Sequence, residues 1–444
     1  MPSPSIFQRH CHAEMRTAVS GEGAFLIDSE GKRYLDACGG AAVSCLGHAA
    51  RPVLEAAKAQ LDQLAYAHTS FFTSEPAEEL AEMLVARAPE GIERVYFVSG
   101  GSEAMEAAIK LARQYFIETG KPERTNIIAR RQSYHGNTLG ALSAGGNEWR
   151  REPFAPMLSQ AMHHIDPVHY WRWGEDGESE EAYGERVAQA LEAKLLELGP
   201  DTVAAFIAEP VVGATMGAVA APAGYFKRIR EICDRHGVLL ILDEVMCGMG
   251  RTGTLFASEQ EGIAPDIVCI AKGLGAGIQP VGAMLCTAAI HDAISAGSGF
   301  FQHGHTYLGH PVACAAGIAV IKEIEGRDLL KNVSEAGAEL LHQLRSTFGQ
   351  HPQIGDIRGR GLFLGLEFVA DRQSKDPLEP EKRTAQRLKK IAMEHGLMCY
   401  PMQGTIDGQR GDHILLAPPF IVESAEIEMI CERLDASFTE LFSA

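Results

Sequence analysis

The chain has 444 residues and a formal net charge of −18 at pH 7. This negative charge argues against nucleic acid or an anionic membrane surface as a partner, because both would repel it. The composition, with 46% hydrophobic and 22% charged residues, is typical of a globular protein and excludes a disordered or fibrous one. The length exceeds one core of ordinary size, which predicts two domains or one large body with an appendage.

The sequence contains no uninterrupted run of about 18 or more apolar residues, so we expect no transmembrane helix. The stretch Met1–Arg16 lacks the continuous apolar region of a secretory signal peptide. The 10 cysteines are scattered without a CxxC pair, and several lie in apolar runs, where a thiol behaves as a small hydrophobe. We therefore expect a reduced, cytoplasmic protein.

The first predicted element is a hairpin, because Phe25–Ile27 and Arg33–Leu35 flank the turn residues Glu30-Gly31. From Arg94 to about Cys286, short β-branched runs alternate with helical stretches such as Tyr225–His236, which Gly237 should end. This alternation predicts a largely parallel sheet covered on both faces, with ligands at the carboxyl ends of its strands. The expected strands are Val95–Val98, Ile127–Ala129, Val203–Ala208, Val238–Leu242, Ile267–Ala271 and Val281–Cys286.

The last part of the chain has a different pattern. A long helical stretch follows Pro311, Gly361–Phe368 is predicted as a strand, and helices are expected at Glu381–His395 and Ser424–Phe442. We expect the two ends of the chain to pack together as a second, smaller domain. The predicted division is an N-terminal part of the small domain at 1–60, a large domain at 61–320, and a C-terminal part of the small domain at 321–444.

Four segments at strand ends could carry chemistry, and the first is Ser99–Ser102. Its glycines would let the backbone approach an anion, and the following helix would add free N–H groups and the Ser102 hydroxyl. A tight strand–helix turn with a capping serine would give the same pattern. No Walker sequence is present, so a nucleotide triphosphate is not the favoured anion.

An acid and a lysine each end a buried strand. Asp243 follows Val238–Leu242, where a carboxylate needs a partner such as a pyridinium N–H, a metal ion or an arginine. Lys272 ends the strand Ile267–Ala271, where desolvation would lower its pKa and favour the neutral, nucleophilic amine. Taken alone, Asp243 could form a structural ion pair and Lys272 could reach solvent beyond the strand.

The fourth segment, and a histidine-containing stretch further along the chain, contain aromatic rings. Tyr134, in Ser133–Gly136, could stack on a flat cofactor, although a tyrosine packed in the core would have the same sequence pattern. His303, His305 and His310 could suggest a metal cluster, but adjacent carboxylates are absent, so we expect no metal site.

Together these segments resemble the class III aminotransferases of the fold-type I pyridoxal-phosphate enzymes. The resemblance runs over nearly the whole chain, from Tyr34–Asp36 to Ala417–Pro419, and depends on the order of its motifs. It implies an α/β fold with a large, mainly parallel sheet domain and a smaller α+β domain. The motifs are SGGSEAMEAA, SYHG, Glu209-Pro210, LDEV, AKG and HGHTYLGHP.

The resemblance also implies roles for individual residues. Lys272 would hold pyridoxal 5′-phosphate as a Schiff base and would later move the proton between substrate and cofactor. Asp243 would pair with the pyridine nitrogen, and Glu209 would lie beside it. Tyr134 and Val245 would contact opposite faces of the ring.

The phosphate and the subunit arrangement follow from the same resemblance. Gly101 and Ser102 would bind the phosphate, and Thr306 would reach the phosphate of a neighbouring subunit. That implies a homodimer with shared active sites. The expected reaction is ping-pong: an amine donor leaves its nitrogen on the cofactor, and a keto acid such as pyruvate then collects it.

The substrate is less constrained. Family members that act on α-amino groups carry an arginine just before Ala-Pro-Pro, whereas this chain has His413–Leu416 there, which favours an amine or ω-amino acid donor. Arg410 lies near the place of a carboxylate-binding arginine, and Phe72 is a candidate for the substrate pocket. A solvated arginine and a core phenylalanine are the alternatives. A phospho-lyase or aminomutase on the same scaffold, or a non-catalytic cofactor-binding protein, stays open.

Overall fold

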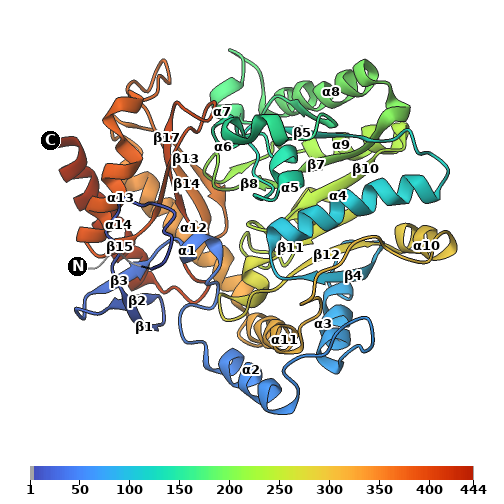
Figure 1. Ribbon diagram of the computed structural model, residues 1–444. Coiled ribbons are helices and arrows are strands. Elements are labelled where there is room, and N and C mark those ends of the chain that lie inside the picture. The colour runs from blue at the N-terminus through green and yellow to red at the C-terminus, as the bar shows by residue number, and fades with distance from the viewer. Residues whose placement is uncertain (1–4, 444) are drawn as a thin grey trace.

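The computed structural model describes residues 5–443, so residues 1–4 of the predicted small domain lie outside the described part (Figure 1). Within it, the largest sheet has seven strands in the order β4-β12-β11-β10-β7-β5-β6. All six predicted strands are present, and β6 was missed because its sequence, MHHI, lacks a continuous apolar run. The bounds are β4 Ile92–Val98, β5 Asn126–Arg130, β6 Met162–Ile165, β7 Val203–Ala208, β10 Leu239–Asp243, β11 Ile267–Ile270 and β12 Gly282–Thr287.

The prediction of a mainly parallel sheet is confirmed, with one reversed strand. β6, β5, β7, β10 and β11 run parallel, whereas β12 is antiparallel to both of its neighbours, β11 and β4. Parallel neighbours need a crossover of about a dozen or more residues, usually a helix. The connection from β11 to β12 holds only the short 3-10 turn η4, Lys272–Gly275, so the chain turns back instead.

Alternation along the strands explains why helices cover both faces. In β10, Leu239 and Ile241 pack with α4 (Gly101–Glu118), α5 (Leu139–Ala144) and α10 (Ala288–Ala296). Leu240 and Leu242 point the other way and pack with α3 (Glu75–Val85), α8 (Glu180–Leu198), α9 (Tyr225–His236) and α11 (Pro311–Gly326). Successive side chains in a strand alternate between faces, so an all-apolar strand must be buried on both.

Strands β1, β2 and β3 near the N-terminus lie beside the C-terminal part of the chain (Figure 1, blue and red). Leu35 of β3 pairs in parallel with Leu397 of β15, and side chains from both ends share one hydrophobic core. The boundaries at 60 and 320 stay a prediction. One four-stranded sheet comprises, in order, β1 Ala18–Glu22, β2 Phe25–Asp28, β3 Arg33–Asp36 and β15 Leu397–Met398. A second four-stranded sheet comprises, in order, β13 Ile354–Arg360, β14 Phe363–Phe368, β17 Asp412–Leu416 and β16 Tyr400–Gln403.

Helices and short elements complete the chain. The predicted hairpin at Glu30-Gly31 is present as antiparallel β2 and β3, and α9 ends at Gly237, which has the left-handed φ of +61° expected of a glycine cap. The remaining elements are α1 Gly39–Ala42, α2 Arg51–Gln63, α6 Glu148–Arg151, α7 Tyr170–Trp173, α12 Leu329–Phe348, α13 Thr384–Glu394, α14 Ser424–Ser443, β8 Val211–Val212 and β9 Val219–Ala220.

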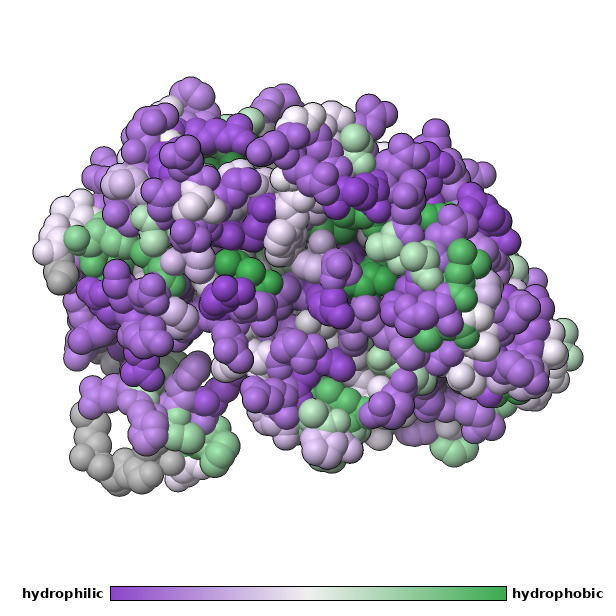
Figure 2. Space-filling model, turned by 90° about the horizontal axis from the view of Figure 1, so that it is seen from above, coloured by the Kyte–Doolittle hydropathy of each residue, from purple (hydrophilic) through white to green (hydrophobic). Residues whose placement is uncertain are grey.

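The surface seen in Figure 2 is mostly hydrophilic, with small separated hydrophobic areas. In the described part of the chain, no helix combines the length and the apolar character needed to cross a bilayer.

Candidate active site

The predicted acid and lysine lie at the carboxyl ends of neighbouring parallel strands. Asp243 is the last residue of β10 and pairs in register with Cys269 of β11, three positions before Lys272. Lys272 opens the turn η4 with a left-handed φ of +48°, which is uncommon for a residue other than glycine. Such a backbone conformation persists only where the surrounding structure holds it, and it is frequent at functional sites.

The surroundings of Lys272 favour a neutral amine. Burial lowers the pKa of Lys272 to about 8, and the nearby carboxylates of Asp243 and Glu209 oppose that shift by raising it. A substantial fraction of the side chain is therefore unprotonated near pH 8. An unprotonated amine is the form that attacks an aldehyde carbon.

Asp243 is buried and held by two hydrogen bonds. Its Oδ2 lies 2.8 Å from Nδ1 of His135, and its Oδ1 accepts a hydrogen bond from the backbone N–H of Val245 at 3.0 Å. Each carboxylate oxygen can accept a second hydrogen bond. His135 was not predicted as a site residue, although it follows Tyr134 directly in the SYHG motif.

Glu209 joins the same group from the loop after β7. Its Oε1 accepts a hydrogen bond from the Tyr134 N–H at 3.0 Å, and its Oε2 accepts one from the Gly213 N–H at 2.9 Å. Burial raises the pKa of Glu209. Glu209 thus fixes the backbone that carries Tyr134 and His135, beside Asp243.

The predicted anion turn packs directly against this group. α4 begins at Gly101, and the first four N–H groups of a helix have no partner within it. Ser102 Oγ accepts a hydrogen bond from the Asn137 N–H at 3.2 Å. A side chain at Gly101 would place its Cβ 2.7 Å from Cγ1 of Val245, and one at Gly136 would lie 2.8 Å from Ser102 Oγ, so both positions require glycine.

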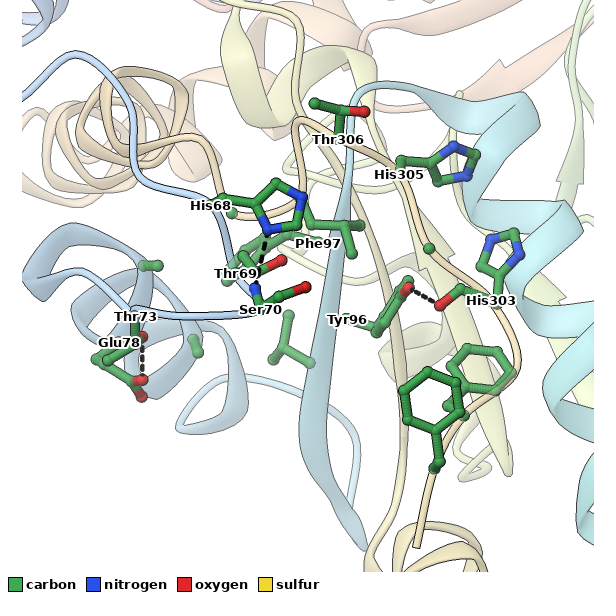
Figure 3. A pocket seen from close by; sticks show the side chains of 18 residues that line it. His68, Thr69, Ser70, Thr73, Glu78, Tyr96, Phe97, His303, His305 and Thr306 are labelled. Atoms are coloured by element: carbon green, nitrogen blue, oxygen red, sulfur yellow. Dashed lines mark hydrogen bonds between the residues drawn. The ribbon is translucent and has the colours of Figure 1, made fainter. Parts of the chain in front are cut away.

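Thr306 lies in the segment between α10 and α11. It lines a cavity of about 710 Å³ with His68, His303 and His305, and neither Lys272 nor Asp243 lines it (Figure 3). Its backbone carbonyl accepts a hydrogen bond from the Tyr66 hydroxyl at 2.9 Å. Within residues 5–443, no group of three or more histidine, cysteine or acidic side chains is arranged to hold a metal ion.

The two predicted substrate residues are both exposed. Phe72 is exposed in the segment between α2 and α3. Arg410 lies in the loop between β16 and β17, where its Nε donates to Asp407 Oδ2 at 2.7 Å and its side chain is 59% exposed. The structure does not test whether either residue binds a substrate, so both stay predictions.

The group around Lys272 fits pyridoxal phosphate on chemical grounds. The cofactor needs an amine for its aldehyde, a carboxylate for its ring nitrogen and N–H donors for its phosphate. Lys272, Asp243 and the start of α4 provide these three at the same edge of one sheet. The fold and the site therefore define a pyridoxal-phosphate enzyme of fold type I.

Comparison with known proteins identifies the family. The family model "Aminotransferase class-III" matches residues 7–438, and the chain belongs to this family. An uncharacterized aminotransferase of Schizosaccharomyces pombe is 45% identical over 432 residues, covering 96% of this chain and 93% of the relative.

Two solved structures show both the fold and the cofactor. The PLP-bound amine transaminase of an uncultivated Pseudomonas species has a TM-score of 0.91 and 38% identity, covering 99% of this chain and 98% of that one. The omega transaminase of Pseudomonas jessenii, in complex with PMP, has a TM-score of 0.92 and 33% identity, with 98% and 97% covered. The protein is thus a pyridoxal-phosphate-dependent class III aminotransferase that resembles the omega transaminases.

Proposed function

We propose that the protein transfers an amino group from an amine or ω-amino acid to a keto acid such as pyruvate, by a ping-pong mechanism. The observation that carries this proposal is the buried Lys272, whose pKa is lowered to about 8, at the strand end next to Asp243. The stretch before Ala-Pro-Pro, His413–Leu416, contains no arginine, which supports an ω-type donor. His413 is buried there, and its ring nitrogens contact Thr405 Oγ1 at 2.6 Å and the Ala214 carbonyl at 3.0 Å.

In this proposal the chain's own residues hold the cofactor and move the proton. Bound pyridoxal phosphate supplies an electron sink that stabilises negative charge at the substrate carbon. Lys272 Nζ would hold the cofactor through its aldehyde carbon, and the free Lys272 amine would move a proton at the substrate carbon. Asp243, oriented by His135, keeps the ring nitrogen protonated.

The other predicted residues position the cofactor. Tyr134 and Val245 contact the two faces of the ring, and Glu209 holds the backbone of Tyr134. Gly101 and Ser102 bind the phosphate at the start of α4, where free N–H groups and the helix dipole favour an anion.

The reaction type can be tested with a panel of amine and ω-amino acid donors and pyruvate. We expect alanine to form in amounts equal to the donor consumed, because the nitrogen passes through the cofactor. Release of ammonia without alanine would instead indicate a lyase, and rearrangement of the donor without an acceptor would indicate an aminomutase. Cofactor absorbance without turnover of any donor would contradict the proposal.

We also propose that the protein is a homodimer whose active sites are shared. Thr306 lines a cavity that Lys272 of its own chain does not line, which supports a role in which Thr306 reaches the partner's phosphate and Phe72 the partner's substrate pocket (Figure 3). Large side chains are exposed in or beside the two chain segments that line this cavity, and exposed hydrophobic patches mark interaction surfaces. They are Tyr66, Phe71, Phe72, Phe300 and Tyr307.

Shared sites predict that two inactive variants restore each other. Lys272→Ala removes the lysine, and Thr306→Glu places a negative charge beside the partner's phosphate. Co-refolded subunits should form mixed dimers with one intact site, giving about a quarter of the wild-type activity for random pairing. The measurement is transaminase activity of the co-refolded mixture against each variant refolded alone. No gain in activity would contradict shared sites.

For the cellular location we propose the cytoplasm. All ten cysteines are unpaired within residues 5–443, and all but Cys11 are buried. Free thiols are typical of a reducing compartment.

A further inference from the structure

A second arginine, Arg150, lies against Tyr134, one of the proposed cofactor-binding residues. It belongs to α6, which follows the SYHG loop and α5. Its guanidinium carbon is 4.8 Å from the centre of the Tyr134 ring and 5.7 Å from that of Trp149. Arginine stacks on aromatic faces in this way without using its N–H donors.

Arg150 is half-buried and has no carboxylate partner. Within residues 5–443 it forms no salt bridge, whereas the adjacent Arg151 bonds to the carbonyls of Ser143 at 2.5 Å and Gly145 at 2.7 Å. Burial is the main cause that lowers the pKa of Arg150, and the positive charge of Arg9 lowers it further. A partly buried cation without an anion is unfavourable, so a ligand that supplies one gains affinity there.

The charged groups around Arg150 do not include an acid that neutralises it. Tyr134, Tyr400 and Arg9 are the titratable side chains that influence its pKa, and all three come from different segments. Arg9 also lowers the pKa of Tyr134, so two guanidinium groups lie near one tyrosine. Asp243 acts on Tyr134 in the opposite direction, but it does not influence the pKa of Arg150.

The loop of Arg410 contacts the helix that carries Arg150. A Cβ at Gly408 would lie 2.9 Å from the Trp149 backbone nitrogen, so the two segments pack closely. Arg410 turns to Asp407 of its own loop and is neutralised there. Of the two arginines, only Arg150 combines partial burial, an available guanidinium and contact with Tyr134.

We propose that Arg150 binds the carboxylate of the substrate, both of an ω-amino acid donor and of a keto-acid acceptor. This rests on the proposed function, in which both substrates use the same site in turn. The planar guanidinium can donate two parallel hydrogen bonds to a carboxylate, and its stacking on Tyr134 holds it in place beforehand.

The test uses the holoenzyme of Arg150→Met and follows each half-reaction by the absorbance of the bound cofactor. The two donors, 4-aminobutyrate and butylamine, differ by the presence of a carboxylate. The two acceptors, pyruvate and propanal, differ in the same way. We expect the apparent dissociation constants of the two carboxylates to rise roughly 10- to 100-fold, since charge-assisted hydrogen bonds are lost. The apparent dissociation constants of butylamine and propanal, which have no carboxylate, should change less than about 2-fold.

Two further measurements separate binding from structure. Butyrate, which cannot react, should lose affinity for Arg150→Met by the same factor, and Arg150→Lys should restore part of it. Arg131→Met is the control, because Arg131 is an exposed arginine paired with Asp166, and it should leave all constants unchanged.

Three results would overturn the inference. An equal loss for carboxylates and for butylamine would show that Arg150 is structural. Unchanged carboxylate binding in Arg150→Met, or a selective loss in Arg410→Met instead, would exclude Arg150 as the anchor. If the wild-type protein converts butylamine but Arg150→Met shows no loss confined to carboxylate substrates, only the inference about Arg150 fails. If the wild-type protein converts no donor, the proposed function fails as well.

Discussion

Replacing Lys272 by alanine should lower kcat by roughly 10⁴-fold or more, because one side chain supplies both the covalent bond to the cofactor and the proton transfer. The direct measurement is mass spectrometry after borohydride reduction. Wild-type protein should gain the mass of the reduced cofactor on Lys272, and Lys272→Ala should gain none. Lys227→Ala, a change on the exposed side of α9, is the matched control and should behave as wild type.

The lowered pKa adds a pH dependence to this result. Below about pH 8 the Lys272 amine is mostly protonated and does not attack an aldehyde; above it the neutral form prevails. The rate at which the cofactor-free protein captures pyridoxal phosphate should therefore rise with pH, with a midpoint near 8. A midpoint near the ordinary lysine pKa, or an adduct that persists in Lys272→Ala, would contradict the assignment.

The second large effect is expected for Asp243→Asn, which should lower kcat by roughly 10²- to 10³-fold. The amide keeps the shape of the side chain but no longer stabilises a protonated ring nitrogen. It also leaves the buried His135 without its charged partner. Single-turnover absorbance changes with a saturating donor would measure the chemical step separately from substrate binding.

Asp266→Asn provides the control for a partly buried acid beside the same sheet. Asp266 precedes β11, pairs with Arg230 at 2.7 Å and accepts the Leu240 N–H at 2.7 Å, so its loss should reduce the free energy of unfolding. We expect it to leave the half-reaction rate of the folded enzyme unchanged. If the two variants slow the reaction equally, Asp243 has no special role at the ring.

Much of the large domain could be predicted from the sequence because its strands are short, apolar and buried on both faces. Val203–Ala208 was predicted residue for residue. β6 could not be found, because His163 and His164 interrupt its apolar pattern and its place depends on hydrogen bonds to β5. The antiparallel direction of β12 could not be predicted, because it depends on the short connection from β11 to β12 and not on the apolar pattern of the strand.

The site was predictable where local sequence determines position. Lys272 and Asp243 end buried strands, so a parallel sheet necessarily brings them to one edge. His135 was missed because its role arises from a contact with Asp243, more than a hundred residues away. Arg150 was missed for a similar reason: its spacing from Tyr134 gives no periodic signal, and only the folded chain shows that it has no acidic partner.

The parallel pairing of β3 with β15 has a consequence for synthesis. Leu35 leaves the ribosome long before Leu397, its partner in the sheet. At about 5–20 residues per second, the N-terminal hairpin waits on the order of 20–70 s for that partner. During this time the edge of β3 that will pair with β15 is unpaired and can bind other chains, and chaperones prevent such aggregation. Recombinant yield should therefore depend on growth temperature and chaperone supply more than the stability of the finished enzyme would suggest.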